Sequence, residues 1–237
     1  MKPSSFALLA AVLTVSLTGA SCASSAHITV SDTADYRLAA DFSPGSLLEK
    51  NIAHLMQHDT GQSIFNREEL QRSLSEAGLS VSTVTLKGIM GLSVGCTLPQ
   101  THRLMNECIE YDRQGRRLKL ILSPETIQLF LTMIPQESRE FIDLLMAPLF
   151  TGDSIQPDEY EELIAAAYGK KVAAELRKSE FLLTLDVPYT IAKVAVYPIG
   201  TAVQTEPHSR RAVIRFPLID LLCTVSTIEI RLEALIR

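Results

Sequence analysis

The chain has 237 residues, of which 46% are hydrophobic and 21% are charged, and its formal net charge is −5. This composition is typical of a protein that buries a sizeable core, and it excludes an intrinsically disordered chain. The negative charge argues against an extended nucleic-acid surface, which needs clustered cations to neutralise phosphates. The chain has no Trp and only 6% aromatic residues, which argues against recognition of bases or sugars by stacking.

The N-terminal residues have the organisation of an export signal. Lys2 supplies a positive charge, residues 6–17 are almost entirely apolar, and small residues follow over 18–22. The apolar stretch is shorter than the ~20 residues that a spanning helix needs. We expect residues 1–21 to form a signal peptide, 22–35 a short polar tether, and 36–237 a single α+β domain, with a sub-boundary near residue 123 as an option.

The end of this leader, Gly19-Ala20-Ser21-Cys22, resembles the lipobox of bacterial lipoproteins, and in particular the relaxed lipobox of spirochaete lipoproteins. In that family the cysteine becomes the first mature residue and carries the acyl chains. Gly19 departs from the family pattern, which usually has an aliphatic residue there, and cleavage after Ala26 is the alternative. The resemblance covers only the leader. It implies acylation at Cys22, by palmitate or a similar chain, and anchoring to a membrane on the periplasmic or outer side of a bacterial cell envelope.

Strands and helices are expected to alternate in blocks along the rest of the chain. Strands are predicted over 27–30, 36–42, 79–86, 181–187, 191–197, 212–216 and 228–232, with a hairpin over 110–118 that turns at Gly115. Helices are predicted over 48–56, from Asn66 to Gly78, from Ser123 to Pro135, and over 136–150, 157–168 and 172–176. Residues 200–209 are expected to form a polar loop. Strict alternation of apolar and polar residues in the last strands favours an antiparallel sheet with one face exposed to solvent. We therefore predict an α+β fold with a mostly antiparallel sheet and helices packed on one face.

Three cysteines remain beyond the leader. Cys96 and Cys108 could form a disulfide across a short loop in an oxidising compartment, and two buried thiols are the alternative. Cys223 lies in an apolar run and is expected in the core. No cysteine spacing resembles a zinc ligand set.

The sequence offers weak signals for chemistry. His54 and His58 lie one helical turn apart and are weak candidates for a metal site, although the Glu of the zinc-protease motif is absent between them. The stretch Gly91-Leu-Ser93-Val-Gly95 matches a nucleophile elbow, but no helix is expected directly after it. We therefore assign no catalytic residue, no metal and no cofactor.

An excess of apolar residues is the most suggestive feature. The stretches 127–134 and 141–150 contain more Leu, Ile, Met and Phe than a helix pair needs to cover one sheet face. Such a surplus forms either deep core or a groove for an acyl chain or a partner. The candidate groove residues are Ile127, Phe130, Met133, Phe141, Leu145 and Met146.

These observations favour an exported, lipid-anchored envelope protein with a non-enzymatic role, either structural or binding an apolar ligand or a protein partner. The expected partners are a membrane surface, reached through the acyl anchor, a lipid or other apolar ligand, and an envelope protein, with no nucleic acid. The alternative is an envelope hydrolase with an unrecognised active site.

Overall fold

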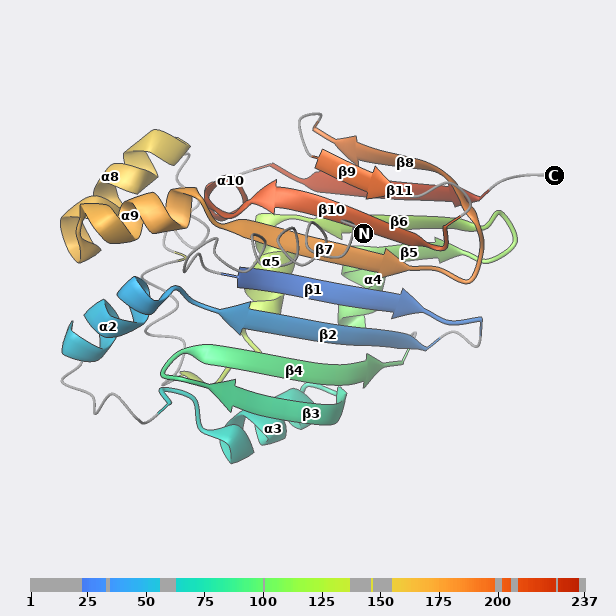
Figure 1. The fold of residues 1–237 in the computed structure, drawn as a ribbon. Helices are drawn as coiled ribbons and strands as arrows, with labels where there is room; N and C mark the ends of the chain where they lie inside the picture. The colour runs from blue at the N-terminus through green and yellow to red at the C-terminus, as the bar shows by residue number, and fades with distance from the viewer. Residues whose placement is uncertain are drawn as a thin grey trace, which may run out of the picture.

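The computed structural model describes residues 23–32, 35–55, 63–99, 101–136, 146, 155–198, 202–205, 209–224 and 226–234. Their strands form two sheets (Figure 1). Sheet A has seven strands in the order β3 (Ser80–Lys87), β4 (Gly91–Leu98), β2 (Tyr36–Ser43), β1 (Ala23–Val30), β7 (Glu180–Asp186), β10 (Arg211–Pro217) and β9 (Ala202–Thr205). Sheet B has four strands in the order β5 (Ile109–Asp112), β6 (Arg117–Leu122), β11 (Ile228–Ala234) and β8 (Ile191–Tyr197).

Strand β1 lies in the middle of sheet A. It pairs antiparallel with β2, and its other edge pairs with β7 in the one parallel register among the described strands. The tether expected over 22–35 is therefore replaced by a central strand from Ala23 onward. Burial of apolar side chains accounts for this, because Ile28 and Val30 of this strand are 8% and 3% exposed and belong to the main core cluster. The first described residue, Ala23, already belongs to this strand, and Cys22 lies outside the described residues.

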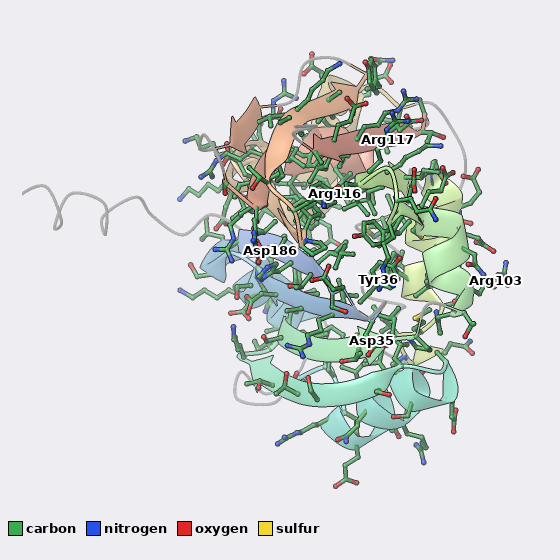
Figure 2. All side chains as sticks on the ribbon, turned by 90° about the vertical axis from the view of Figure 1, so that its right-hand side faces the viewer. Asp35, Tyr36, Arg103, Arg116, Arg117 and Asp186 are labelled. Atoms are coloured by element: carbon green, nitrogen blue, oxygen red, sulfur yellow. The ribbon has the colours of Figure 1, made fainter. Side chains whose placement is uncertain are left out.

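The helices occupy one face and one end of sheet A (Figures 1 and 2). Helices α3 (Arg67–Glu76), α4 (Arg103–Cys108) and α5 (Pro124–Leu131) lie on one face, together with sheet B. Helices α2 (Ser46–Leu55), α8 (Pro157–Tyr168), α9 (Lys170–Arg177) and α10 (Leu218–Leu222) gather at one end of the strands. The predicted class is confirmed: an α+β fold with mostly antiparallel sheets. Within the described ranges, no helix is long and apolar enough to cross a membrane.

Local signals in the sequence fix several element boundaries. The Ser123 hydroxyl accepts the Thr126 N–H at 3.3 Å, while the Thr126 hydroxyl accepts the Ser123 N–H at 2.8 Å, so α5 begins with a complete capping box. The side chain of Asn66 caps α3 as predicted, and Gly78 ends it with a φ of +89°. The hairpin between β5 and β6 also forms, although the positive φ falls on Arg116 and not on Gly115.

Other elements differ from the prediction. Strand β9 occupies part of the expected loop over 200–209, because its short polar segment is completed by pairing with β10. Helices α4 and α10 were not predicted. The helix predicted over 157–168 forms as α8, in which Tyr160, Ile164 and Tyr168 are buried and Leu163 is 54% exposed. Helix α8 packs mainly against α9 and contacts α10.

A candidate apolar binding cavity

One face of sheet A is apolar across its central strands. In β2, Tyr36, Leu38, Ala40 and Phe42 share this face, because side chains two residues apart in a strand point the same way. Figure 2 shows Tyr36 between sheet A and the α4–α5 side of the molecule, whereas Asp186 lies on the opposite side of the sheet. We call the Tyr36 side the inner face and the Asp186 side the outer face.

A cavity of about 410 Å³ lies against the inner face. Ligand pockets in proteins typically have volumes of roughly 300–1,000 Å³, so this space is large enough for a small ligand. Sheet A provides one wall through the side chains of Ala26, Ile28, Leu38, Ala40, Phe42, Leu92, Val94, Phe181 and Leu183.

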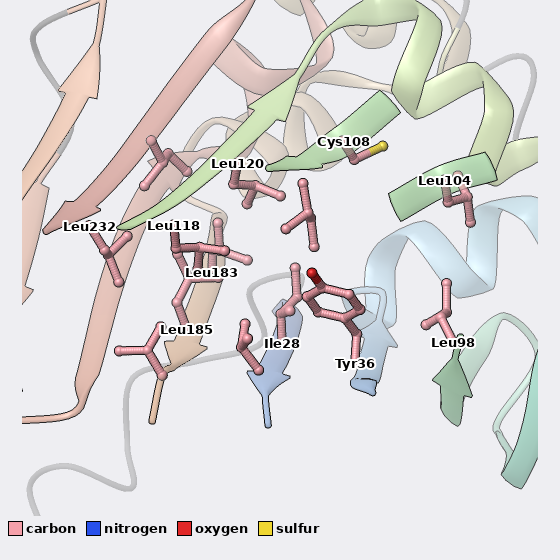
Figure 3. Packing of buried hydrophobic residues seen from close by; sticks show 14 of the residues in the cluster. Ile28, Tyr36, Leu98, Leu104, Cys108, Leu118, Leu120, Leu183, Leu185 and Leu232 are labelled. Carbon is pink, nitrogen blue, oxygen red and sulfur yellow. The ribbon is translucent and has the colours of Figure 1, made fainter. Parts of the chain in front are cut away.

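The opposite wall comes from α4, α5 and sheet B. Helix α5 and the residues after it contribute Ile127, Phe130, Leu131 and Ile134, while α4, β5 and β6 contribute Leu104, Cys108, Ile109, Leu120 and Leu122. Figure 3 shows this opposition: Ile28, Tyr36 and Leu183 point from sheet A toward Leu120 and Cys108. Leu48, Leu176, Leu218 and Leu222 line the cavity at the helical end.

The cavity is elongated along β2. Its lining extends from Tyr36 to Phe42 on that strand, and the six steps between these residues span ~20 Å at about 3.3 Å each. One leaflet of a bilayer has a hydrocarbon thickness of about 15 Å, half of the ~30 Å core. The cavity therefore has the length and the wall chemistry that one acyl chain requires.

The inner face is incompletely packed at the middle of the sheet. Tyr36 and Leu98, near one end of their strands, are buried, but Leu38, Leu92 and Val94 are only half-buried and Ala40 is exposed. Protein interiors are normally packed as densely as organic crystals. Side chains on the inner face that retain accessible surface therefore mark a space that the described residues do not fill.

Two buried polar side chains without partners belong to β1 and α9, and only the first of them, Ser24, lines the cavity. The Ser24 hydroxyl and the Glu175 carboxylate are each on a residue only 9% exposed, and neither has a hydrogen-bond partner. Burial raises the pKa of Glu175. Its carboxylate packs so closely on Gly45 that a Cβ there would meet Oε1 at 1.6 Å. Ser24 is one of the residues that line the cavity.

Four of the six candidate groove residues are among the residues that the structure describes. Ile127, Phe130 and Met146 line the cavity. Met133 instead packs in the main core cluster and is 8% exposed. Phe141 and Leu145 lie outside the described residues. The wall formed by sheet A was not predicted, although the alternation of Tyr36, Leu38, Ala40 and Phe42 is a signal of it in the sequence.

The candidate disulfide is not formed. Cys96 and Cys108 are free, buried thiols, as is Cys223. Burial raises the pKa of each of the three to about 11. Because the thiolate is the species that forms disulfides, these thiols are held in the unreactive state. The buried-thiol alternative is correct.

The structure describes only one of the two histidines that were metal candidates. His54 is exposed on α2, His58 lies outside the described residues, and no metal-binding group of His, Cys, Asp and Glu occurs in the part of the chain that the structure describes. His27 contacts Asp186 at 2.7 Å and Thr29 at 3.5 Å, but both contacts use the same Nε2 on the outer face. A catalytic relay requires the two different ring nitrogens. Ser93 pairs within β4 with Asp41 and Thr85, so it does not sit on a nucleophile elbow.

Comparison with known proteins does not assign this chain to a family. No protein-family model matches the chain, and no curated protein matches it. Among solved structures, the folded domain of the LppM protein of Mycobacterium tuberculosis, determined by NMR, is similar with a TM-score of 0.38 and 13% identity, over 91% of each chain. Similarity at this level does not establish a shared fold.

Proposed function

We propose that this protein binds the acyl chain of a lipid in its inner-face cavity while an acylated Cys22 anchors it to a membrane of a bacterial envelope. The observation that carries the proposal is the apolar cavity of about 410 Å³ between sheet A and α5. Each methylene moved from water into such a space contributes ~0.8 kcal/mol. A chain of a dozen or more methylenes can therefore bind tightly without any polar contact.

The wall chemistry supports an apolar ligand over a substrate. An enzyme needs a reacting group, an acid or base and stabilising donors in one cleft. The described walls are formed mainly by aliphatic and aromatic side chains, with Ser24, Ser25, Arg37 and Asp41 as the polar members of the lining. The thiol of Cys108 in that wall is held protonated by burial. The export signal and the lipobox resemblance support the location at an envelope membrane.

Lipid binding can be tested with two variants of the same strand. Ala40 lines the cavity, whereas Ala39 belongs to the outer face. We expect Ala40→Phe to weaken binding of a fluorescent fatty-acid analogue by about tenfold or more, since displacing two methylenes removes ~1.6 kcal/mol.

Ala39→Phe is the matched control and is expected to leave the affinity unchanged. Thermal unfolding of both variants checks that they fold. Mass spectrometry of lipid extracted from the purified wild-type protein would identify the natural ligand. Absence of analogue binding to the unacylated Cys22→Ala protein, together with absence of extractable lipid from it, would refute the proposal.

A further inference from the structure

The anchor point and the cavity are adjacent in the chain. Strand β1 begins at Ala23, and Ser24, Ser25 and Ala26 all line the cavity. Consecutive Cα atoms are 3.8 Å apart, so the Cα of Cys22 lies within about 7.6 Å of the Cα of Ser24 in any conformation. An acyl group on Cys22 therefore starts beside the cavity wall, with no tether between them.

We infer that one acyl chain carried by Cys22 occupies the inner-face cavity of its own protein. This inference rests on the proposed function, because it requires both the acylated cysteine and a cavity that takes an acyl chain. The wall next to Ser24 suits such a chain: Phe42 and Phe181 are the register partners of Ser24 in β2 and β7, and both line the cavity.

Covalent attachment decides which chain fills the cavity. A ligand held on a short linker has an effective concentration of about millimolar at its site, well above that of a lipid monomer in water. The lipoprotein resemblance implies more than one acyl chain on the cysteine, so one chain can enter the cavity while another stays in the bilayer. The cavity is then closed by its own anchor until a free lipid displaces that chain.

Photo-crosslinking in cells tests this arrangement on the full chain. Cells expressing the protein are grown with a palmitate analogue that carries a diazirine, irradiated, and the acylated Cys22 peptide is examined by mass spectrometry. The expected result is a cross-link from the Cys22 acyl chain to cavity-lining residues of the same molecule, such as Phe130 or Leu131. Ala40→Phe should abolish these cross-links, and Ala39→Phe should retain them.

Two results would overturn the inference, and they differ in what else they affect. Label on Cys22 with cross-links only to membrane lipid would remove the inference and leave the anchor and the lipid-binding cavity standing. Absence of label on Cys22 would remove both the inference and the anchor. In neither case would the binding of an added fatty-acid analogue to the purified protein be affected. That binding assay therefore shows independently whether the cavity takes an acyl chain.

Discussion

Glu175 carries a buried carboxylate without a hydrogen-bond partner, and burial raises its pKa. The folded state therefore favours the protonated form, and stability falls as pH rises from the unfolded-state value near ~4.3 through the raised native value. We expect Glu175→Gln to stabilise the protein at pH 7 by on the order of 1 kcal/mol and to have no such effect below the unfolded-state pKa. Urea unfolding at both pH values measures this. Glu162→Gln, on the exposed face of α8, is the control; a destabilised Glu175→Gln variant at pH 7 would contradict the prediction.

The contribution of Asp186, on the outer face, to stability has the opposite dependence on pH. Arg211 donates to its two carboxylate oxygens at 2.7 and 2.8 Å, and His27 contacts it at 2.7 Å. The hydrogen bond from Arg211 is the main cause of a lowered pKa of Asp186. The stability that this carboxylate contributes is present above its unfolded-state pKa and is lost as pH falls through the lowered native value. Asp186→Asn should cost about 1 kcal/mol at pH 7 and progressively less in acid.

The same unfolding series separates this effect from general surface changes. Glu180 forms a more exposed pair with Arg215 at 3.2 Å, so Glu180→Gln should change stability less than Asp186→Asn. If Asp186→Asn reduced the free energy of unfolding equally at all pH values, the charge of Asp186 would not be the cause of its stabilising effect.

At the scale of elements, the N-cap of α5 connects local structure to the cavity. Ser123 caps the helix that places Ile127, Phe130 and Leu131 in the cavity wall. Ser123→Ala should reduce the free energy of unfolding by ~1 kcal/mol and weaken lipid binding, because the frayed helix no longer holds its wall residues. Asn66→Ala removes the equivalent cap from α3, none of whose residues line the cavity. It should reduce stability by a similar amount and leave the affinity unchanged. Denaturant unfolding and a lipid titration of both variants distinguish the two roles.

Elements with local signals were predictable from the sequence. A capping hydroxyl before Pro124, an Asn66 N-cap and the alternation of β7 and β11 each depend on residues within a few positions of one another. Elements that need a distant partner were not predictable. Strand β9 exists through its pairing with β10, and β1 becomes a central strand only through β7, whose paired residues are 157 positions further along the chain.

At the scale of the whole molecule, the cavity illustrates the same limit. The apolar surplus over 127–134 indicated either core or groove, and the sequence could not decide between them. The decision depends on how far sheet A lies from α5 and sheet B, and this distance is set by packing among segments that span most of the chain. Small residues on the inner face, such as Ala26 and Ala40, leave the space open. The effect of these small side chains on the cavity volume can be predicted only when the opposing wall is known.

The three buried thiols provide a probe of the entire fold. Cys96 and Cys108 lie in the main core cluster, and Cys223 lies in the second cluster at the helical end. Thiols held protonated by burial react with a maleimide only when the protein opens. A ligand at 100 times its Kd stabilises the folded state by ~2.7 kcal/mol, which reduces the open population about a hundredfold.

We therefore expect a saturating fatty-acid analogue to slow maleimide modification of all three thiols to a similar extent, because a ligand between sheet A and the opposing wall stabilises both clusters through one cooperative fold. Mass spectrometry of the modified peptides over time gives the three rates separately. Protection of Cys108 alone, the one of these three thiols in the cavity wall, would instead show that the ligand only blocks access and that the two clusters open independently. Ala40→Phe should lose the protection at every thiol, whereas Ala39→Phe should keep it, so the slowing is attributable to the cavity and not to the added lipid.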